Sequence, residues 1–201
     1  MAGTMPHAIF IETDLDGNGL AGAYAAELPG CAVFAPGADE AAGAMPMRVN
    51  RFTAWLRENG EVSPSFVGDN WYEVERAPAG PDRRAAFTLD ELPPSDAEFA
   101  SWLRWLELAR EELADALDSG DPLSVADQLD AIERQDVAFV GELGGAAPQL
   151  SSDPIDRLYI ARDALTDALT AAGPMHDGVR RILRLAIADD LRAADALRPS
   201  A

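Results

Sequence analysis

The pattern of apolar and polar residues divides the chain into a first part made of short strands and a longer helical part. Three apolar runs lie between turn residues and predict strands over 7–12, 20–26 and 31–35. Residues 14–19 separate the first two runs and are rich in types that tolerate a positive φ, which favours a hairpin turn. The chain therefore begins with a small antiparallel sheet.

A helix is predicted over 39–59 because apolar residues recur there at spacings of four, three and four. These residues are Met45, Val49, Phe52 and Leu56. Pro46 lies inside this run and predicts a kink or a broken first half, and Gly60 closes the helix as a left-handed cap. Residues 66–75 predict one more strand, and the proline- and glycine-rich residues 78–81 predict a linker.

Four further amphipathic helices are predicted in the rest of the chain. Ser95 and Glu98 have the spacing of a capping box, and Asp153 with Pro154 supplies an N-cap and a first-turn proline. The predicted helices cover 95–120, 124–143, 153–173 and 177–197. We therefore predict an α+β fold, with a small N-terminal β-β-β-α(-β) module over 1–77, a linker over 78–94 and a C-terminal four-helix bundle over 95–201.

The charge balance restricts the classes of partner. The 201 residues include 35 Asp and Glu against 16 basic residues, all of them arginine, and the net charge is −19. This charge repels a phosphate backbone, so we expect no nucleic-acid partner. The acidity is typical both of a halophile with a high-salt cytosol and of a high-GC organism, and the sequence leaves both origins open.

Two further observations limit the location and the chemistry. The start of the sequence lacks a basic segment followed by a long apolar run, and no apolar stretch approaches the roughly 20 residues that a membrane-spanning helix needs. We therefore expect no membrane partner and a cytoplasmic protein. The single Cys31 excludes an intrachain disulfide and a cysteine-rich zinc site.

The first third of the chain carries a motif of moderate specificity. A hairpin is followed by ELPGC at 27–31, then by PGADEA at 36–41, which opens a helix that ends WLRENG at 55–60. This order resembles the HicB-like domain. The resemblance implies a small unit of three strands and one helix, which in toxin–antitoxin pairs covers a basic toxin. The alternative, which we favour, is a folded unit that only packs on the rest of the chain.

The helical part resembles the DinB-like superfamily. Residues 122–129 (PLSVADQL) with Ile132 are similar to its second helix, and residues 181–190 (RILRLAIADD) are similar to its last helix. The resemblance implies a four-helix bundle. Members of this superfamily commonly bind a divalent metal through three histidines, and some transfer thiols such as mycothiol or bacillithiol.

The histidines that this resemblance implies are absent. In the best register the three positions hold Ala131, Asp189 and Ala193, and a slip of one residue offers Asp130 for the first. The two histidines of the chain, at positions 7 and 176, lie outside the amphipathic runs from which a ligand would project into the bundle. The metal chemistry of the superfamily therefore does not carry over.

Each predicted bundle helix instead carries one charged residue within its apolar stripe. On a helical wheel these residues are Arg110, Asp136, Arg162 and Asp190, and their charges sum to zero. An isolated buried charge costs several kcal/mol, so the four should pair with one another or reach the rim. Two interpretations follow: a structural ion-pair network, which we favour, or a polar pocket that binds a small charged ligand.

Two hypotheses of function remain. The first is a non-catalytic binding or scaffold protein without a cofactor, whose partner is a small charged ligand or a basic protein. A homodimer is also open, since DinB-like bundles are often dimers. The second is a divergent metal-dependent transferase or hydrolase with Asp136, Asp189 and Asp190 as ligands, which suit Mg²⁺, Ca²⁺ or Mn²⁺. We favour the first, and with it a protein that is not an enzyme.

Overall fold

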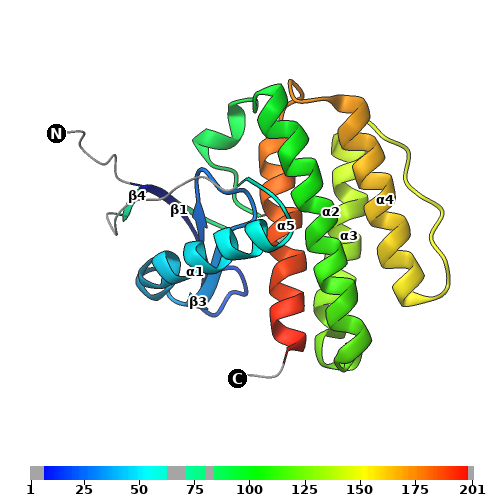
Figure 1. The fold of residues 1–201 in the computed structure, drawn as a ribbon, viewed down its shortest axis with the longest axis horizontal. Helices are drawn as coiled ribbons and strands as arrows, with labels where there is room; N and C mark the ends of the chain where they lie inside the picture. Colours follow the sequence, from blue (N-terminus) through cyan, green and yellow to red (C-terminus); the bar gives the residue numbers. More distant parts are fainter. Residues whose placement is uncertain (1–6, 63–70, 80–83, 199–201) are drawn as a thin grey trace. The chain divides into compact units, whose positions relative to one another are not determined.

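The fold is α+β, with a small sheet and one helix followed by a helical bundle, in agreement with the sequence prediction (Figure 1). A computed structural model describes residues 7–62, 71–79 and 84–198, and the chain forms two compact units, Met1–Leu92 and Pro93–Ala201. The first unit contains β1 (His7–Thr13), β2 (Leu20–Ala25), β3 (Ala32–Pro36), α1 (Ala38–Glu58), β4 (Trp71–Pro78) and the short 3-10 helix η1 (Thr88–Glu91).

The sheet of the first unit has the strand order β3-β2-β1-β4. Strands β1, β2 and β3 pair antiparallel, as consecutive hairpin-connected strands do, whereas β4 pairs parallel to β1. The β1–β2 connection is the predicted hairpin turn, in which Oδ1 of Asp16 accepts hydrogen bonds from the backbone N–H groups of Asn18 and Leu20. Strand β4 begins at Trp71 and ends later than predicted, and residues 66–70 of that prediction lie outside the described residues.

Helix α1 packs on the three antiparallel strands and is a single helix through Pro46. Met45 and Val49, on either side of the proline, are both buried, so the apolar stripe is continuous across it. The predicted break is therefore wrong. Packing of the stripe on the sheet outweighs the one hydrogen bond that proline removes.

The segment that precedes the second unit is part of the first fold rather than a free linker. The carboxylate of Glu12, which is fully buried, accepts from the backbone N–H of Ala85 at 2.5 Å and from Nε of Arg84 at 3.1 Å. The ring of Phe87 lies 5.0 Å from that of Phe10 and 6.1 Å from that of Tyr24. The division between the units falls after Leu92, inside the predicted 78–94 linker, but residues 84–92 belong to the first unit.

This anchoring leads to a prediction about fragments. A fragment of residues 1–92 should fold with native-like circular dichroism, whereas one of residues 1–77 should not, because it leaves the Glu12 carboxylate buried without Arg84 and Ala85. Residues 93–201 should stay helical and melt cooperatively. Circular dichroism of the three fragments measures this, and a folded 1–77 fragment would show that residues 84–92 are dispensable.

The second unit contains four long helices and one short 3-10 helix. Ser95 and Glu98 form the predicted capping box at the start of α2, and the side chain of Asp153 accepts from the first free N–H groups of α4. The elements are α2 (Asp96–Ser119), η2 (Pro122–Val125), α3 (Ala126–Glu142), α4 (Pro154–Ala172) and α5 (Val179–Leu197). The helix predicted to begin at residue 124 thus starts as a 3-10 turn.

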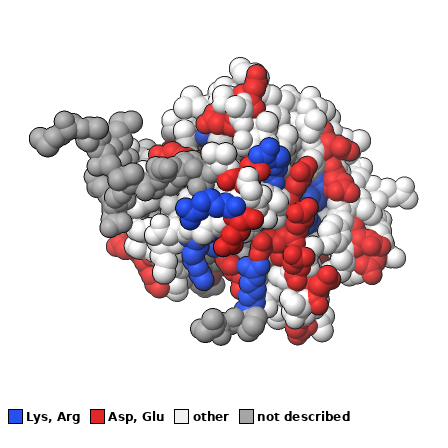
Figure 2. Space-filling view, viewed as in Figure 1, with Lys and Arg blue, Asp and Glu red and all other residues white. Residues whose placement is uncertain are grey.

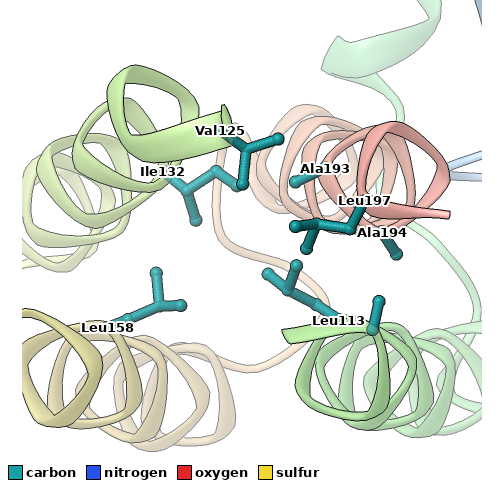
Figure 3. Packing of buried hydrophobic residues seen from close by; sticks show 8 residues of the cluster. Leu113, Val125, Ile132, Leu158, Ala193, Ala194 and Leu197 are labelled. Carbon is teal, nitrogen blue, oxygen red and sulfur yellow. The ribbon is translucent and has the colours of Figure 1, made fainter. Parts of the chain in front are cut away.

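Helices α2 and α3 form the first half of the second unit, and α4 and α5 form the other half. Each helix packs mainly against a helix from the other half. Helix α2 packs on α5 and α3 packs on α4, while α2 lies diagonally across the bundle from α3, and α4 lies diagonally across from α5 (Figure 3). Arg180 stacks over Trp102 and Asp190 meets Arg110, which shows that α2 and α5 run in the same direction. Around the C-terminal end of α5, buried residues of all four helices and of η2 form an apolar cluster, which consists of Leu113, Ala116, Val125, Ile132, Leu158, Ala193, Ala194 and Leu197.

No helix within the described ranges combines the length and the apolar character required to cross a membrane.

Candidate functional site

The four charged residues that the sequence places in the apolar stripes meet inside the bundle. Arg110 comes from α2, Asp136 from α3, Arg162 from α4 and Asp190 from α5. Their exposed fractions are 5%, 1%, 3% and 0%, so all four are cut off from solvent. We call these four residues the ion network.

Each arginine of the ion network holds one aspartate with two hydrogen bonds and the other with one. Arg110 donates from Nε and Nη2 to Asp190 at 3.1 and 3.0 Å, and from Nη2 to Asp136 at 3.2 Å. Arg162 donates from Nε and Nη2 to Asp136 at 3.0 and 3.2 Å, and from Nη2 to Asp190 at 3.1 Å. Side-on pairing of this kind is the strongest geometry between a guanidinium and a carboxylate.

The remaining donor of Arg110 bonds to the backbone, and that of Arg162 does not. Nη1 of Arg110 donates to the carbonyl of Leu158 at 2.9 Å. In the parts of the chain that the structure describes, Nη1 of Arg162 has no hydrogen-bond acceptor. The ion network therefore satisfies nearly all of its own polar groups.

The electrostatics of the site favour the charged form of Arg162. Burial acts to lower the pKa of Arg162, but the carboxylates of Asp136 and Asp190 outweigh it and hold that pKa above its ordinary value. Burial raises the pKa of Asp136, and the Arg162 and Arg110 guanidinium groups oppose this shift. The two positive and two negative charges cancel, which is the condition under which charges persist in a protein interior.

Buried leucines enclose the ion network on both sides. Leu106 and Leu113 flank Arg110 along α2, and Leu158 and Leu165 flank Arg162 along α4; their exposed fractions are 0–1%. Figure 3 shows Leu113 and Leu158 pointing into the apolar cluster that closes one side. The network is a polar layer between two apolar layers.

The candidate metal ligands do not form one cluster. Asp136 and Asp190 are joined through the arginines, whereas the half-buried Asp189 accepts a hydrogen bond from Nε2 of Gln135 at 2.8 Å. No group of three or more metal-ligating side chains occurs among the described residues. Two guanidinium groups repel a divalent cation and already engage the oxygen atoms that would bind it. These residues therefore do not fit a metal.

The positions that the resemblance to the DinB-like superfamily predicted as ligand positions have unrelated surroundings. Ala131 is exposed on α3, as is Asp130, and Ala193 is part of the apolar cluster. His176 is exposed, with Nδ1 2.7 Å from the carbonyl oxygen of Asp177, and His7 stacks on Trp71. The structure thus brings neither histidine into the bundle interior.

Several polar contacts were not predicted from the sequence. Buried Glu133 pairs with Arg157 at 2.6 Å, and Arg181 pairs with Glu142. In the first unit, the Glu12 carboxylate accepts from Tyr24 as well as from Arg84. Helical spacing could have placed Glu133 and Arg157 on helix faces, but their partners depend on which helices are neighbours.

Cys31 is fully buried, and burial raises the pKa of its thiol to about 12. A thiol with this pKa is almost entirely protonated at neutral pH, so it is a poor nucleophile. Cys31 therefore packs as a small apolar side chain in the core of the first unit.

The fold and the site together define a two-unit α+β protein whose helical bundle has a neutral ion network at its centre. No protein-family model matches the sequence, and no curated protein or solved structure is significantly similar to the chain.

Proposed function

We propose that this is a non-catalytic binding or scaffold protein, with a HicB-like first unit and a DinB-like bundle that has lost its metal-binding histidines. The observation that carries the proposal is the closed ion network of Arg110, Asp136, Arg162 and Asp190. Seven hydrogen bonds join the network's own members and the Leu158 carbonyl, so neither carboxylate of the network is free to bind a metal.

The surface charge supports a positively charged partner. Acidic side chains gather over the helices of the second unit (Figure 2). Along α2 alone, six exposed residues are acidic: Asp96, Glu98, Glu107, Glu111, Asp115 and Asp118. A net charge of −19 steers basic proteins toward this surface and repels nucleic acid. We propose a basic protein as the binding partner.

Metal analysis of the purified protein tests this proposal against the metal-dependent alternative. We expect far less than one equivalent of divalent metal per chain after purification without chelator. Titration with Mg²⁺, Ca²⁺ or Mn²⁺ should raise the melting temperature no more than NaCl of the same ionic strength does, because salt only screens the net charge of −19 whereas a metal that binds the folded state adds stability of its own. Stoichiometric metal that is lost in an Asp136→Asn variant would contradict the proposal and favour a metal-dependent transferase or hydrolase.

A further inference from the structure

Helices α2 and α4 carry the same sequence pattern around their network arginines. Residues 106–117 read LELAREELADAL, and residues 158–169 read LYIARDALTDAL. Seven of these twelve aligned positions are identical, and the alignment places Arg110 on Arg162. The identities include an exposed aspartate, at 115 and 167, which the demands of a buried stripe do not explain. The match therefore indicates a repeat rather than only a shared helical pattern.

The helix that follows each of them repeats the second half of the ion network. Asp136 follows Arg110 by 26 residues, and Asp190 follows Arg162 by 28 residues. The residues just before these aspartates, Gln135 and Asp189, correspond to each other and are joined by a hydrogen bond. We call α2 with α3 the first helix pair, and α4 with α5 the second.

The hydrogen bonds of the ion network are also equivalent in the two helix pairs. Arg110 holds the aspartate of the second pair with two bonds and that of its own pair with one. Arg162 holds the aspartate of the first pair with two bonds and that of its own pair with one. Exchanging the two helix pairs therefore reproduces the pattern, as a two-fold axis through the network would.

The main packing surfaces lie between the two pairs, not within them. Helix α2 packs on α5 and α3 packs on α4, so each pair buries its apolar faces against the other pair (Figure 3). The interface between the pairs is thus the core of the bundle. A symmetrical two-part core of this kind is the arrangement that two separate chains adopt when they form a bundle together.

We propose that the bundle is a duplicated helix pair, and that the surface of each pair accepts the complementary pair of a second copy of this chain. In the exchanged dimer the first pair of one chain packs on the second pair of its partner, and the reverse. Every contact of the bundle core is kept. Only the connection between α3 and α4 differs, because it now leads from one bundle to the other. This inference is independent of the proposed function, because it requires only the packing of the bundle.

The length of the connection decides between the closed and the exchanged form. Gly145 caps α3 and lies against Ala168 of α4, while Asp153 caps the start of α4. Fifteen helical residues separate positions 153 and 168, so the connection must run back about 22 Å along α4. The eight peptide units from Gly145 to Asp153 reach at most about 28 Å. The native connection therefore spans this distance with little slack.

Deleting residues 146–150 from the full-length chain tests the proposal. The three remaining peptide units reach only about 11 Å, so the chain cannot close on itself. We expect a dimer by size-exclusion chromatography with light scattering, with the helical content and cooperative melting of the wild type. The matched control replaces residues 146–150 by five Gly and Ser residues and should have the oligomeric state of the wild type. A deletion variant that is a folded monomer would overturn the proposal.

A second experiment decides the matter if the deletion variant does not fold. Leu113→Asp breaks the first pair, and Leu165→Asp breaks the second at the corresponding position; both leucines are fully buried. Each variant alone should lose the helical signal of the bundle. When both are unfolded together and refolded, the exchanged heterodimer contains one intact bundle out of two, so half of the lost signal should return. Refolded mixtures with no more helix than the separate variants would refute the exchange.

Discussion

Replacing Asp136 by alanine should lower the free energy of unfolding of the helical unit by about 3–5 kcal/mol, the cost typical of a broken buried ion pair. Asp136 accepts two hydrogen bonds from Arg162 and one from Arg110, and its side chain is 1% exposed. Its loss leaves two buried guanidinium groups with one carboxylate between them. Urea unfolding followed by circular dichroism at 222 nm measures the change.

The matched control is Asp130→Ala on the same helix. Asp130 is exposed, and exposed charges contribute at most about 1 kcal/mol. If Asp136→Ala and Asp130→Ala lower the free energy of unfolding equally, the ion network does not stabilise the bundle. The buried carboxylate would then contribute no more than a solvated one. Arg162→Ala should lower the free energy of unfolding as much as Asp136→Ala does, since it also leaves an unpaired charge in the core.

The second large effect is expected in the first unit, where Glu12→Ala should cost about 3 kcal/mol. The Glu12 carboxylate accepts from the Tyr24 hydroxyl at 2.9 Å, from Arg84 and from the Ala85 backbone. Its removal leaves the buried Ala85 N–H without its acceptor. It should also release residues 84–92 from the rest of the first unit. Chemical unfolding measures the loss of stability, and limited proteolysis near Arg84 reports the release.

Glu73→Ala is the control for this second effect. Glu73 pairs with Arg76 at 2.7 Å on the exposed strand β4, and a solvent-exposed pair of this kind contributes at most about 1 kcal/mol. If Glu12→Ala is as mild as Glu73→Ala, the Glu12–Arg84 contact does not anchor the segment. Protease resistance near Arg84 in Glu12→Ala would argue for the same conclusion.

The elements of this fold are predictable from the sequence because their signals are local. Ser95 with Glu98 and Asp153 with Pro154 mark helix starts by hydrogen bonds to the nearest N–H groups, and the structure places α2 and α4 there. The prediction of a break at Pro46 is wrong because it rests on a local signal alone. The local cost of this proline is visible in the sequence, while the packing of α1 on the sheet that outweighs it is not.

The members of the ion network are predictable, but their pairing is not. Helical periodicity shows that Arg110 and Asp190 face inward, and it says nothing of which helices are neighbours or of their directions. Side-on pairing of Arg110 with Asp190 follows from the packing of α2 on α5, which is a tertiary contact. Glu12 and Arg84 are 72 residues apart and leave no periodic signal at all.

Replacing the whole ion network by apolar side chains tests whether it is a structural substitute for an apolar core layer. The variant Arg110→Met, Asp136→Leu, Arg162→Met, Asp190→Leu replaces all four charges by apolar side chains of similar volume. We predict a free energy of unfolding within about 2 kcal/mol of the wild type or above it, because no charge is left unpaired. A loss of stability as large as that of Asp136→Ala would show that the network is not such a substitute, because the four charges would then be needed for more than pairing with one another.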